Sequence, residues 1–216
     1  MSAQPHVRQH PQRCYHVGNV RTQLLRAARQ ILEEQGKDAL SLRAISLRAG
    51  VALGTIYHHY DSKHSLLAGL AVEGFEELVA RMRRALEERT EDQTGLHATG
   101  YAYIAFLCER PALYRLMFES VDLGRTPEVI EAEDRAFRII ADSIHVASTR
   151  RPTPEVAEQV AMAIWAWGRG IAAVGFSRGG QGEAPQRSAV NTALEGLKAI
   201  FAWGANSALP AAAVAK

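Results

Sequence analysis

Apolar residues recur at helical spacing in two short segments between residues 41 and 63, and a glycine separates the segments. Ser41 can cap the first helix, whose inward residues are Leu42, Ile45 and Ala49. Gly50 then stands where a helix ends in a left-handed turn. A second helix of roughly two turns carries Ile56 inward and leaves its other face outside. The pattern predicts a helix-turn-helix that can enter the major groove of DNA.

The same periodicity continues on both sides of this motif. We expect a first helix from about Asn19 to Gln35 that packs over the motif, and a long helix that begins at Asp61 or Ser62 and keeps its apolar spacing to Leu86. Five further helices are expected at 95–109, from Pro111, over 127–148, from Pro154 and over 187–204. No strand pattern appears, so the sequence predicts an all-α protein.

These elements divide the chain into four parts. Residues 1–18 lack periodicity and are expected to be a disordered arm. Residues 19–64 form the predicted helix-turn-helix domain, which the long helix joins to a helical body over residues 65–206. Residues 207–216 are expected to be a flexible tail.

The charge differs between the first part of the chain and the rest. Residues 1–64 contain 9 Lys and Arg against 4 Asp and Glu, whereas the remaining residues contain 16 against 19. Six of the 8 His residues also lie in the first 64 positions. A basic N-terminal unit joined to a mildly acidic body suits a protein whose head binds phosphates.

Cysteine content and hydropathy indicate in which cellular compartment we expect the protein. Only Cys14 and Cys108 are present, which favours a reducing environment without a disulfide framework. The chain lacks a charge-free apolar run of about 20 residues, so we expect a cytoplasmic protein that does not enter a membrane. The first 18 residues include His6, His10, Cys14 and His16, whose spacing matches no metal-ligand motif. The alternative to a metal site is a basic arm that touches DNA. No metal or cofactor is expected.

Nine positions from the glycine turn onward form a recognisable series: Gly50, Val51, Gly54, Thr55, Ile56, Tyr57, His59, Tyr60 and Lys63. The series resembles the TetR family of bacterial transcriptional regulators, and the resemblance covers residues 20–72. It implies a three-helix DNA-binding head, an operator of double-stranded DNA as partner, and DNA-contacting roles for particular residues.

Four of these roles concern the phosphate backbone. Ser41, Tyr57, His59 and Lys63 match the family's phosphate-binding positions. Hydroxyl, imidazole and ammonium groups there would fix the register on DNA without reading its sequence. For Tyr57 the alternative is a tyrosine of the core.

The other roles concern the bases. Arg43 stands where family members reach a guanine, whose O6 and N7 a guanidinium can bond together, and the alternative is a solvent-exposed arginine. Ala52, Leu53 and Thr55 open the second helix of the motif, where the apolar side chains could contact a thymine methyl and Thr55 a base or a phosphate. His58 is expected to reach a base or to remain in solvent.

In the body, YIAFLCERPALYRLMF (103–118) and WAWGRG (165–170) are similar to a TetR subgroup marked by a Trp and a His-Gly pair. Arg169 replaces the histidine of that pair. The resemblance implies a small-molecule pocket lined by Tyr103, Phe106, Leu107, Met117, Phe118, Trp165 and Arg169. Mostly apolar walls with a few polar groups suit a pocket. The alternative is that these residues are ordinary core.

The last two long helices carry apolar residues on more than one face. Between Val156 and Phe176, and again over 187–204, these residues exceed the single stripe of a surface helix. Another helix could approach closely at the small residues of the first of these segments, which are Ala161, Ala166, Gly168, Gly170 and Gly175. We therefore expect a homodimer that joins these helices in a four-helix bundle, and the alternative is a monomer in which they are central.

Catalysis finds little support in this sequence. A di-metal helical oxidase would need repeated Glu-x-x-His, and the chain offers only Asp142 to His145. No nucleophile has a recognisable companion base. We expect a DNA-binding regulator, a repressor released by a small, mostly apolar effector. The alternative is a ligand-independent regulator whose body recruits a protein partner.

Overall fold

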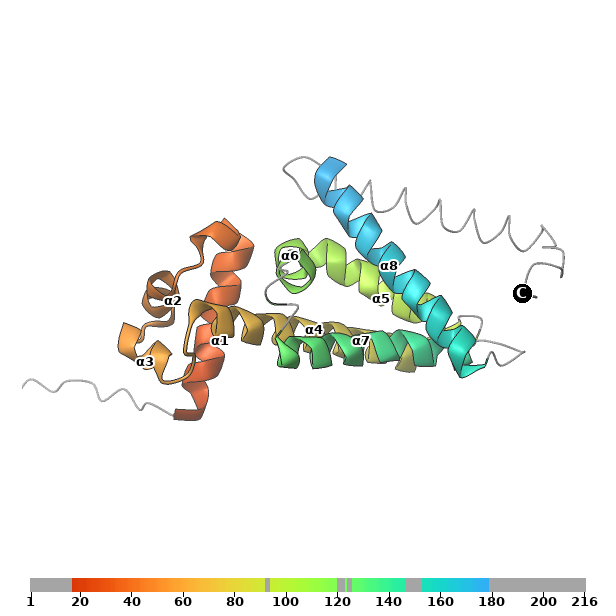
Figure 1. The fold of residues 1–216 in the computed structure, drawn as a ribbon, viewed down its shortest axis with the longest axis horizontal. Coiled ribbons are helices and arrows are strands. Elements are labelled where there is room, and N and C mark those ends of the chain that lie inside the picture. The colour runs from red at the N-terminus through yellow and green to blue at the C-terminus, as the bar shows by residue number, and fades with distance from the viewer. Residues whose placement is uncertain (1–16, 92–93, 120–122, 124–125, 147–152, 179–216) are drawn as a thin grey trace, which may run out of the picture. The chain divides into compact units, whose positions relative to one another are not determined.

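The computed structural model describes residues 17–91, 94–119, 123, 126–146 and 153–178, and every regular element in these ranges is helical (Figure 1). The α-helices are α1 (Val17–Gln35), α2 (Leu42–Ala49), α3 (Leu53–Tyr57), α4 (Lys63–Glu87), α5 (Gly95–Glu109), α6 (Pro111–Glu119), α7 (Pro127–Val146) and α8 (Pro154–Arg178), with a 3-10 turn, η1, at Lys37–Ala39. The prediction of an all-α fold is confirmed. The helix expected over 187–204 and the tail lie outside the described residues.

The chain divides into two compact units, Met1–Leu66 and Leu67–Lys216. We call their described parts the head and the body. Helix α4 passes through the boundary without a break.

The head is organised around the inner face of α1. Leu24, Ala28, Ile31 and Leu32 of this face are almost completely buried. Ile45 of α2 and Ile56 of α3 are fully buried as well, as the apolar spacing predicts. Two short helices are therefore held in the head by one apolar residue each at their centres.

Local chemistry sets the ends of α2. The Ser41 hydroxyl accepts a hydrogen bond from the Ala44 amide at 3.1 Å, which is the predicted N-cap. Gly50 has φ 67°, and its amide donates to the carbonyls of Leu47 and Ser46. A left-handed residue at this place favours glycine, so the predicted turn is confirmed. The following helix is shorter than expected, because α3 has 5 residues.

The helices of the body pack closely where a side chain is absent. A Cβ atom on Gly74 of α4 would overlap the side chain of Met117 of α6. A Cβ atom on Gly168 of α8 would lie 2.7 Å from the Tyr103 ring of α5. Arg81 adds a polar link, because it pairs with Glu77 on its own helix and with Glu109 of α5.

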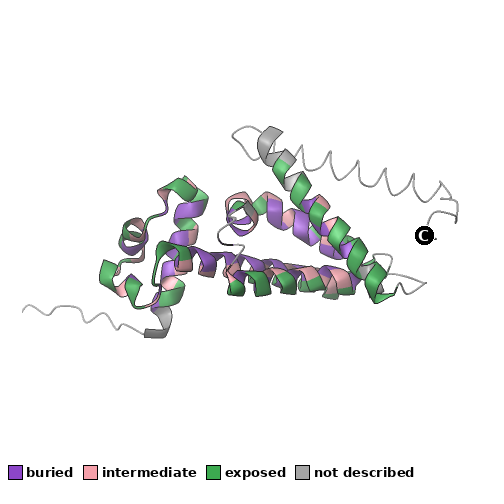
Figure 2. Cartoon of the chain, viewed as in Figure 1, coloured by how far each residue is buried: buried purple, intermediate pink, exposed green. Residues whose placement is uncertain are grey.

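Helix α8 is only partly covered within the described chain, and much of it is exposed in Figure 2. Ala161 and Trp165 are buried, whereas Val156, Val160 and Met162 are between 37% and 54% exposed. Ala161, which the sequence offered for contact with another helix, thus lies inside the body. Gly170 is exposed, and a Cβ atom on this residue would have no neighbouring atom within 4 Å.

Candidate nucleic-acid interface and ligand site

The packing of α3 decides which of its residues face solvent. Ile56 is fully buried, whereas the other residues of α3 are exposed or half-buried (Figure 2). Ala52, Leu53, Tyr57 and His58 are exposed, and Thr55 and His59 are half-buried. Ser41, Arg43 and Lys63, which flank α3 in sequence, are also exposed. All nine residues expected to contact DNA are therefore accessible at least in part.

Two nearby tyrosines have opposite environments. Tyr57 is 54% exposed, so the alternative in which it belongs to the core is wrong. Tyr60 is 4% exposed instead, and its hydroxyl accepts a hydrogen bond from Arg21 Nε at 3.3 Å. The Arg21 guanidinium also lies 5.6 Å from the centre of the Tyr60 ring. Tyr60 thus links the end of the motif to α1, whereas more than half of Tyr57 is exposed.

The cations of the head differ in whether a carboxylate neutralises them. Arg48 of α2 bonds to both carboxylate oxygens of Glu34 at 3.0 and 2.8 Å. The hydrogen bond from Arg48 lowers the pKa of Glu34, so the pair is charged at neutral pH. Arg43 and Lys63 have no ion pair with another residue of the described ranges. Both side chains are exposed, so within the described residues their charges are not neutralised by a carboxylate.

Leu47 of α2 is a residue that sequence reasoning missed. Its side chain is 83% exposed, although leucine is apolar and the residue lies within a helix of the motif. The inward spacing of Leu42, Ile45 and Ala49 left position 47 on the opposite face, and that offset was the available signal.

In the body, aromatic rings from four helices meet around Trp165 of α8. Its ring centre lies 5.6 Å from that of Tyr103, 5.6 Å from that of Phe118 and 6.0 Å from that of Phe137. Phe118 also contacts Phe75 at 5.1 Å and Tyr114 at 4.5 Å. These distances are typical of edge-to-face and tilted aromatic contacts. We call Tyr103, Tyr114, Phe118, Phe137 and Trp165 the aromatic cluster.

Polar groups occupy one edge of the aromatic cluster. Trp165 Nε1 donates a hydrogen bond to Glu133 Oε1 at 3.3 Å. The same carboxylate oxygen lies 3.8 Å from Arg169 Nη1, while Arg169 Nη2 donates to the Phe118 carbonyl at 3.1 Å. The Arg169 guanidinium also lies 5.4 Å from the centre of the Phe118 ring. Arg169 is therefore held on the cluster by a charge, a hydrogen bond and a ring contact.

A second polar contact lies inside the cluster. The hydroxyls of Tyr103 and Tyr114 are 2.6 Å apart, and both side chains are buried. Burial raises the pKa of Tyr103 well above its usual value, and the neighbouring Tyr114 raises it further. The Tyr103 phenol therefore stays neutral in the folded protein at physiological pH.

A hollow of about 560 Å³ borders the cluster between α7 and α8. Its lining includes Trp165 and Arg169 together with Phe137 and Met162. Charged residues on its rim are Glu133, Asp134, Arg138 and Glu158. Its size is in the range of small-molecule sites, and its walls combine rings with charges.

The residues predicted to line one pocket are distributed over more than one place. Tyr103, Phe118, Trp165 and Arg169 meet in or on the aromatic cluster. Phe106 instead lies beneath Arg81, 5.5 Å from its guanidinium carbon, and Met117 fills the space beside Gly74. Leu107 is buried. Glu133 and Phe137 were missed because they lie about 30 positions from Trp165, and only the packing of α7 on α8 brings them together.

Comparison with known proteins adds the family. The profile of bacterial regulatory proteins of the tetR family matches residues 24–70, and that of a tetracyclin repressor-like C-terminal domain matches residues 96–197. The chain belongs to the TetR family. Members of this family are helix-turn-helix, DNA-binding transcriptional regulators, and neither the family nor the relatives described next are enzymes.

Two curated relatives are similar over part of their length. The transcriptional activator FasR of Mycolicibacterium smegmatis is 31% identical over 57% of this chain and 56% of its own. The regulator UidR of Escherichia coli K12 is 35% identical over 38% of this chain and 38% of its own. The chain thus spans about half, or less, of the length of these relatives.

A solved structure extends the similarity in fold. A TetR-family transcriptional regulator from Streptomyces coelicolor has a TM-score of 0.60 at 22% identity, over 85% of this chain and 98% of the other.

No helix in the described ranges is long and apolar enough to cross a membrane. Those ranges also contain no group of three or more His, Cys, Asp or Glu residues suited to a metal ion.

Proposed function

We propose that this regulator is a cytoplasmic, homodimeric repressor that binds operator DNA through the head and releases it when a small, mostly apolar effector binds the body. The observation that carries the effector proposal is the aromatic cluster, which ends in the Glu133–Arg169 pair and borders the hollow between α7 and α8. The relative FasR is named an activator, and expression of a reporter gene behind the operator distinguishes the two directions, because a repressor lowers it.

In the head, the proposal divides the accessible residues by role. Ser41, Tyr57, His59 and Lys63 bind phosphates and set the register of α3 on DNA. Arg43 reads a guanine through its two parallel donors. Ala52, Leu53, Thr55 and His58 face base edges, where the small and apolar side chains permit close approach to a thymine methyl.

In the body, the effector occupies the hollow and rests against the rings of Trp165 and Phe137. Glu133 and Arg169 then offer an acceptor and several donors to the effector's polar groups. Tyr103 and Phe118 contact the Trp165 ring and hold it in place, whereas Phe106, Leu107 and Met117 are buried elsewhere in the body. Of the seven residues, only Trp165 and Arg169 line the hollow and touch the effector.

The dimer uses an exposed face of α8. Val156, Val160, Ala163, Trp167 and Gly170 recur at intervals of four and three, which places them on one side of the helix. Each is exposed or half-buried in the single chain. A second copy would cover this face, with the helix expected over 187–204 completing a four-helix bundle.

Release from DNA follows from linkage. An effector that binds one arrangement of the dimer more tightly than another shifts the population toward the first. If that arrangement fits the operator poorly, the effector lowers the affinity for DNA. The operator lowers the affinity for the effector by the same factor, because the coupling is reciprocal. Helix α4 carries residues of both units, and it is the continuous element through which the shift reaches the head.

A three-part experiment tests the effector proposal. An operator is first selected from random duplex DNA with the purified protein. Compounds that raise the melting temperature are then tested for release of that operator and for quenching of Trp fluorescence. Wild-type protein should show all three responses with the same compounds.

Trp165→Phe should weaken these responses together, because it removes the hydrogen bond to Glu133 and part of the wall. Tyr101→Phe, at an exposed position of α5 outside the hollow and outside the proposed dimer face, is the control. Compounds that stabilise the protein without affecting operator affinity would refute release by this site, since equal affinity for both arrangements shifts nothing. A screen without any stabilising compound would favour the ligand-independent regulator.

The dimer face is tested by light scattering. Val160→Glu should shift the protein toward monomer, because it places a charge in an apolar interface. Gln159→Glu adds the same charge at the neighbouring exposed position and should leave the dimer intact. A wild-type monomer at micromolar concentration would exclude this interface.

A further inference from the structure

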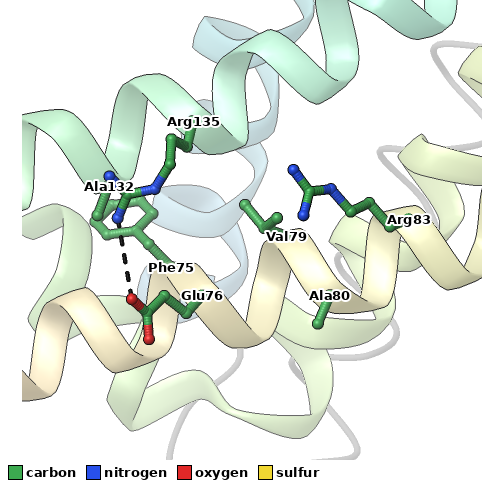
Figure 3. A pocket seen from close by; sticks show the side chains of 7 residues that line it. All are labelled: Phe75, Glu76, Val79, Ala80, Arg83, Ala132 and Arg135. Carbon is green, nitrogen blue, oxygen red and sulfur yellow. Dashed lines mark ion pairs between the residues drawn. The ribbon is translucent and has the colours of Figure 1, made fainter.

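A second hollow, of about 200 Å³, lies between α4 and α7 (Figure 3). Its apolar lining consists of Phe75, Val79 and Ala80 of α4 and Ala132 of α7. Phe75, Val79 and Ala132 are at most 9% exposed, so packing fixes this lining in place. None of the residues proposed to touch DNA or the effector lines this hollow.

Charged groups stand at its rim. Arg83 and Glu76 come from α4 and Arg135 comes from α7, and in Figure 3 the Val79 side chain lies between the two guanidinium groups. Arg135 is 4.0 Å from the Glu76 carboxylate, and both side chains are about half exposed or more. An exposed ion pair at this distance contributes little to the stability of the fold. The Arg83 side chain has no hydrogen bond or ion pair with another residue in the described ranges.

Two guanidinium groups against one carboxylate leave the rim with a net positive charge. Guanidinium groups bind carboxylates through paired hydrogen bonds and also stack on aromatic rings. The apolar lining below them cannot satisfy a polar ligand, so it selects a ligand with an apolar part. The ligand that fits both features is an anion at one end and apolar at the other.

The volume limits the size of the apolar part. An apolar protein cavity of about 150 Å³ holds one benzene molecule. A hollow of about 200 Å³ therefore has room for one ring with a carboxylate attached. We propose that the hollow between α4 and α7 is a binding site for a small aromatic carboxylate, whose ring lies against Phe75 and Val79 and whose carboxylate is bound by Arg83 and Arg135.

Binding at this site would join α4 to α7, because each helix supplies one of the two guanidinium groups. In the empty site Glu76 competes for Arg135. The ligand carboxylate therefore replaces a weak contact within the chain, which gives Glu76 an effect on affinity opposite to that of the arginines.

Benzoate is the probe, and benzyl alcohol is its neutral counterpart. Both are titrated into the full-length protein without DNA, and binding is followed by calorimetry and by ligand-observed NMR. Benzoate should bind, and benzyl alcohol should bind at least about tenfold more weakly, because it lacks the charge. Arg83→Gln and Arg135→Gln should each weaken benzoate binding by about tenfold.

Three further variants separate a site from a general charge effect. Glu76→Gln should strengthen benzoate binding, because it frees Arg135. Ala80→Trp should block binding, since a bulky side chain at this exposed position can fill the hollow. Arg84→Gln removes the same charge from the next position of α4, outside the lining, and should leave affinity unchanged. Equal binding of benzyl alcohol, or equal losses in Arg83→Gln and Arg84→Gln, would overturn the proposal.

Discussion

The hydroxyl groups of Tyr103 and Tyr114 lie 2.6 Å apart in the interior of the body, and their rings meet edge to face at 6.0 Å. One residue comes from α5 and the other from α6. The contact therefore links two successive helices across the Pro111 junction through a polar pair that is shielded from water. A short hydrogen bond in such surroundings is stronger than one at the surface.

Tyr103→Phe should lower the free energy of unfolding by about 1 to 3 kcal/mol, because it removes this buried hydrogen bond. Tyr114→Phe should have a similar effect. The double variant should lose less than the sum of the two single variants, since both remove the same interaction. Urea denaturation measures the three values, and strict additivity would show that the two hydroxyls do not stabilise one another.

Alkaline pH should destabilise the protein through Tyr103. Burial raises the pKa of Tyr103 well above its usual value, so the folded state keeps its proton while the unfolded chain releases it from about pH 10 upward. The folded state then binds more protons, and the free energy of unfolding falls as pH rises, by up to about 1.4 kcal/mol per unit for this group. The stability that Tyr103 contributes is thus present below about pH 10 and lost above it.

Urea denaturation between about pH 9 and pH 11 should therefore show a shallower decline for Tyr103→Phe than for the wild type. Tyr101→Phe, at an exposed position of α5, is the control. Parallel declines in wild type and Tyr103→Phe would rule out this source of the pH dependence.

Gly50→Ala should lower the free energy of unfolding by about 1 to 2 kcal/mol, because φ at this residue is 67°. The penalty is conformational, since a Cβ atom there meets nothing within 4 Å. Gly54→Ala adds the same methyl in helical geometry, also without a contact within 4 Å, and should raise stability by up to about 1 kcal/mol. Similar values for the two variants would show that the left-handed turn is not retained.

Lys63→Ala should weaken binding to all duplex DNA alike and should flatten the dependence of affinity on salt, because one phosphate contact fewer releases fewer counterions. Fluorescence anisotropy at several salt concentrations gives both quantities. An unchanged slope would remove Lys63 from the phosphate contacts.

Arg43→Ala should lose about 1 to 3 kcal/mol on the selected operator and much less on random DNA, because a guanine contact acts only where the guanine is present. The same anisotropy assay compares the two kinds of DNA. Equal losses would place Arg43 among the phosphate contacts instead.

Gly168→Ala should lower the free energy of unfolding by about 1 to 3 kcal/mol, because the new methyl would lie 2.7 Å from the Tyr103 ring and force it to move. Gly100→Ala, in a helix with nothing within 4 Å of the added atom, should stabilise the protein slightly. Thermal unfolding ranks the two variants, and a stabilised Gly168→Ala would mean that the Tyr103 ring moves aside freely.

Local patterns were sufficient to predict most helices of this fold. The Ser41 cap, the Gly50 turn, the start of α6 at Pro111 and the start of α8 at Pro154 follow from side-chain chemistry within a few residues, and all appear in the structure. The length of α3 was overestimated, because apolar spacing continues through Tyr60 after the helix has ended.

Contacts between distant residues could not be predicted in the same way. Aromatic residues at helical spacing do not reveal which of them will meet, so Phe106 was grouped with Trp165 although it packs under Arg81. Glu133 carried no signal of its own, because a carboxylate on an amphipathic helix is expected in solvent. Its contacts with Trp165 and Arg169 arise only from the packing of α7 on α8.

The close contact between Gly74 and Met117 restricts which substitutions this sequence can accept during evolution. Met117 of α6 occupies the space that a side chain on α4 would otherwise take, so the two positions share one fixed volume. Growth at position 74 then requires shrinkage at position 117, and either change alone leaves an overlap or a void. Among descendants of this chain, the sizes of these two residues should vary in opposite directions, and the flexible thioether of methionine makes the first small step the easiest.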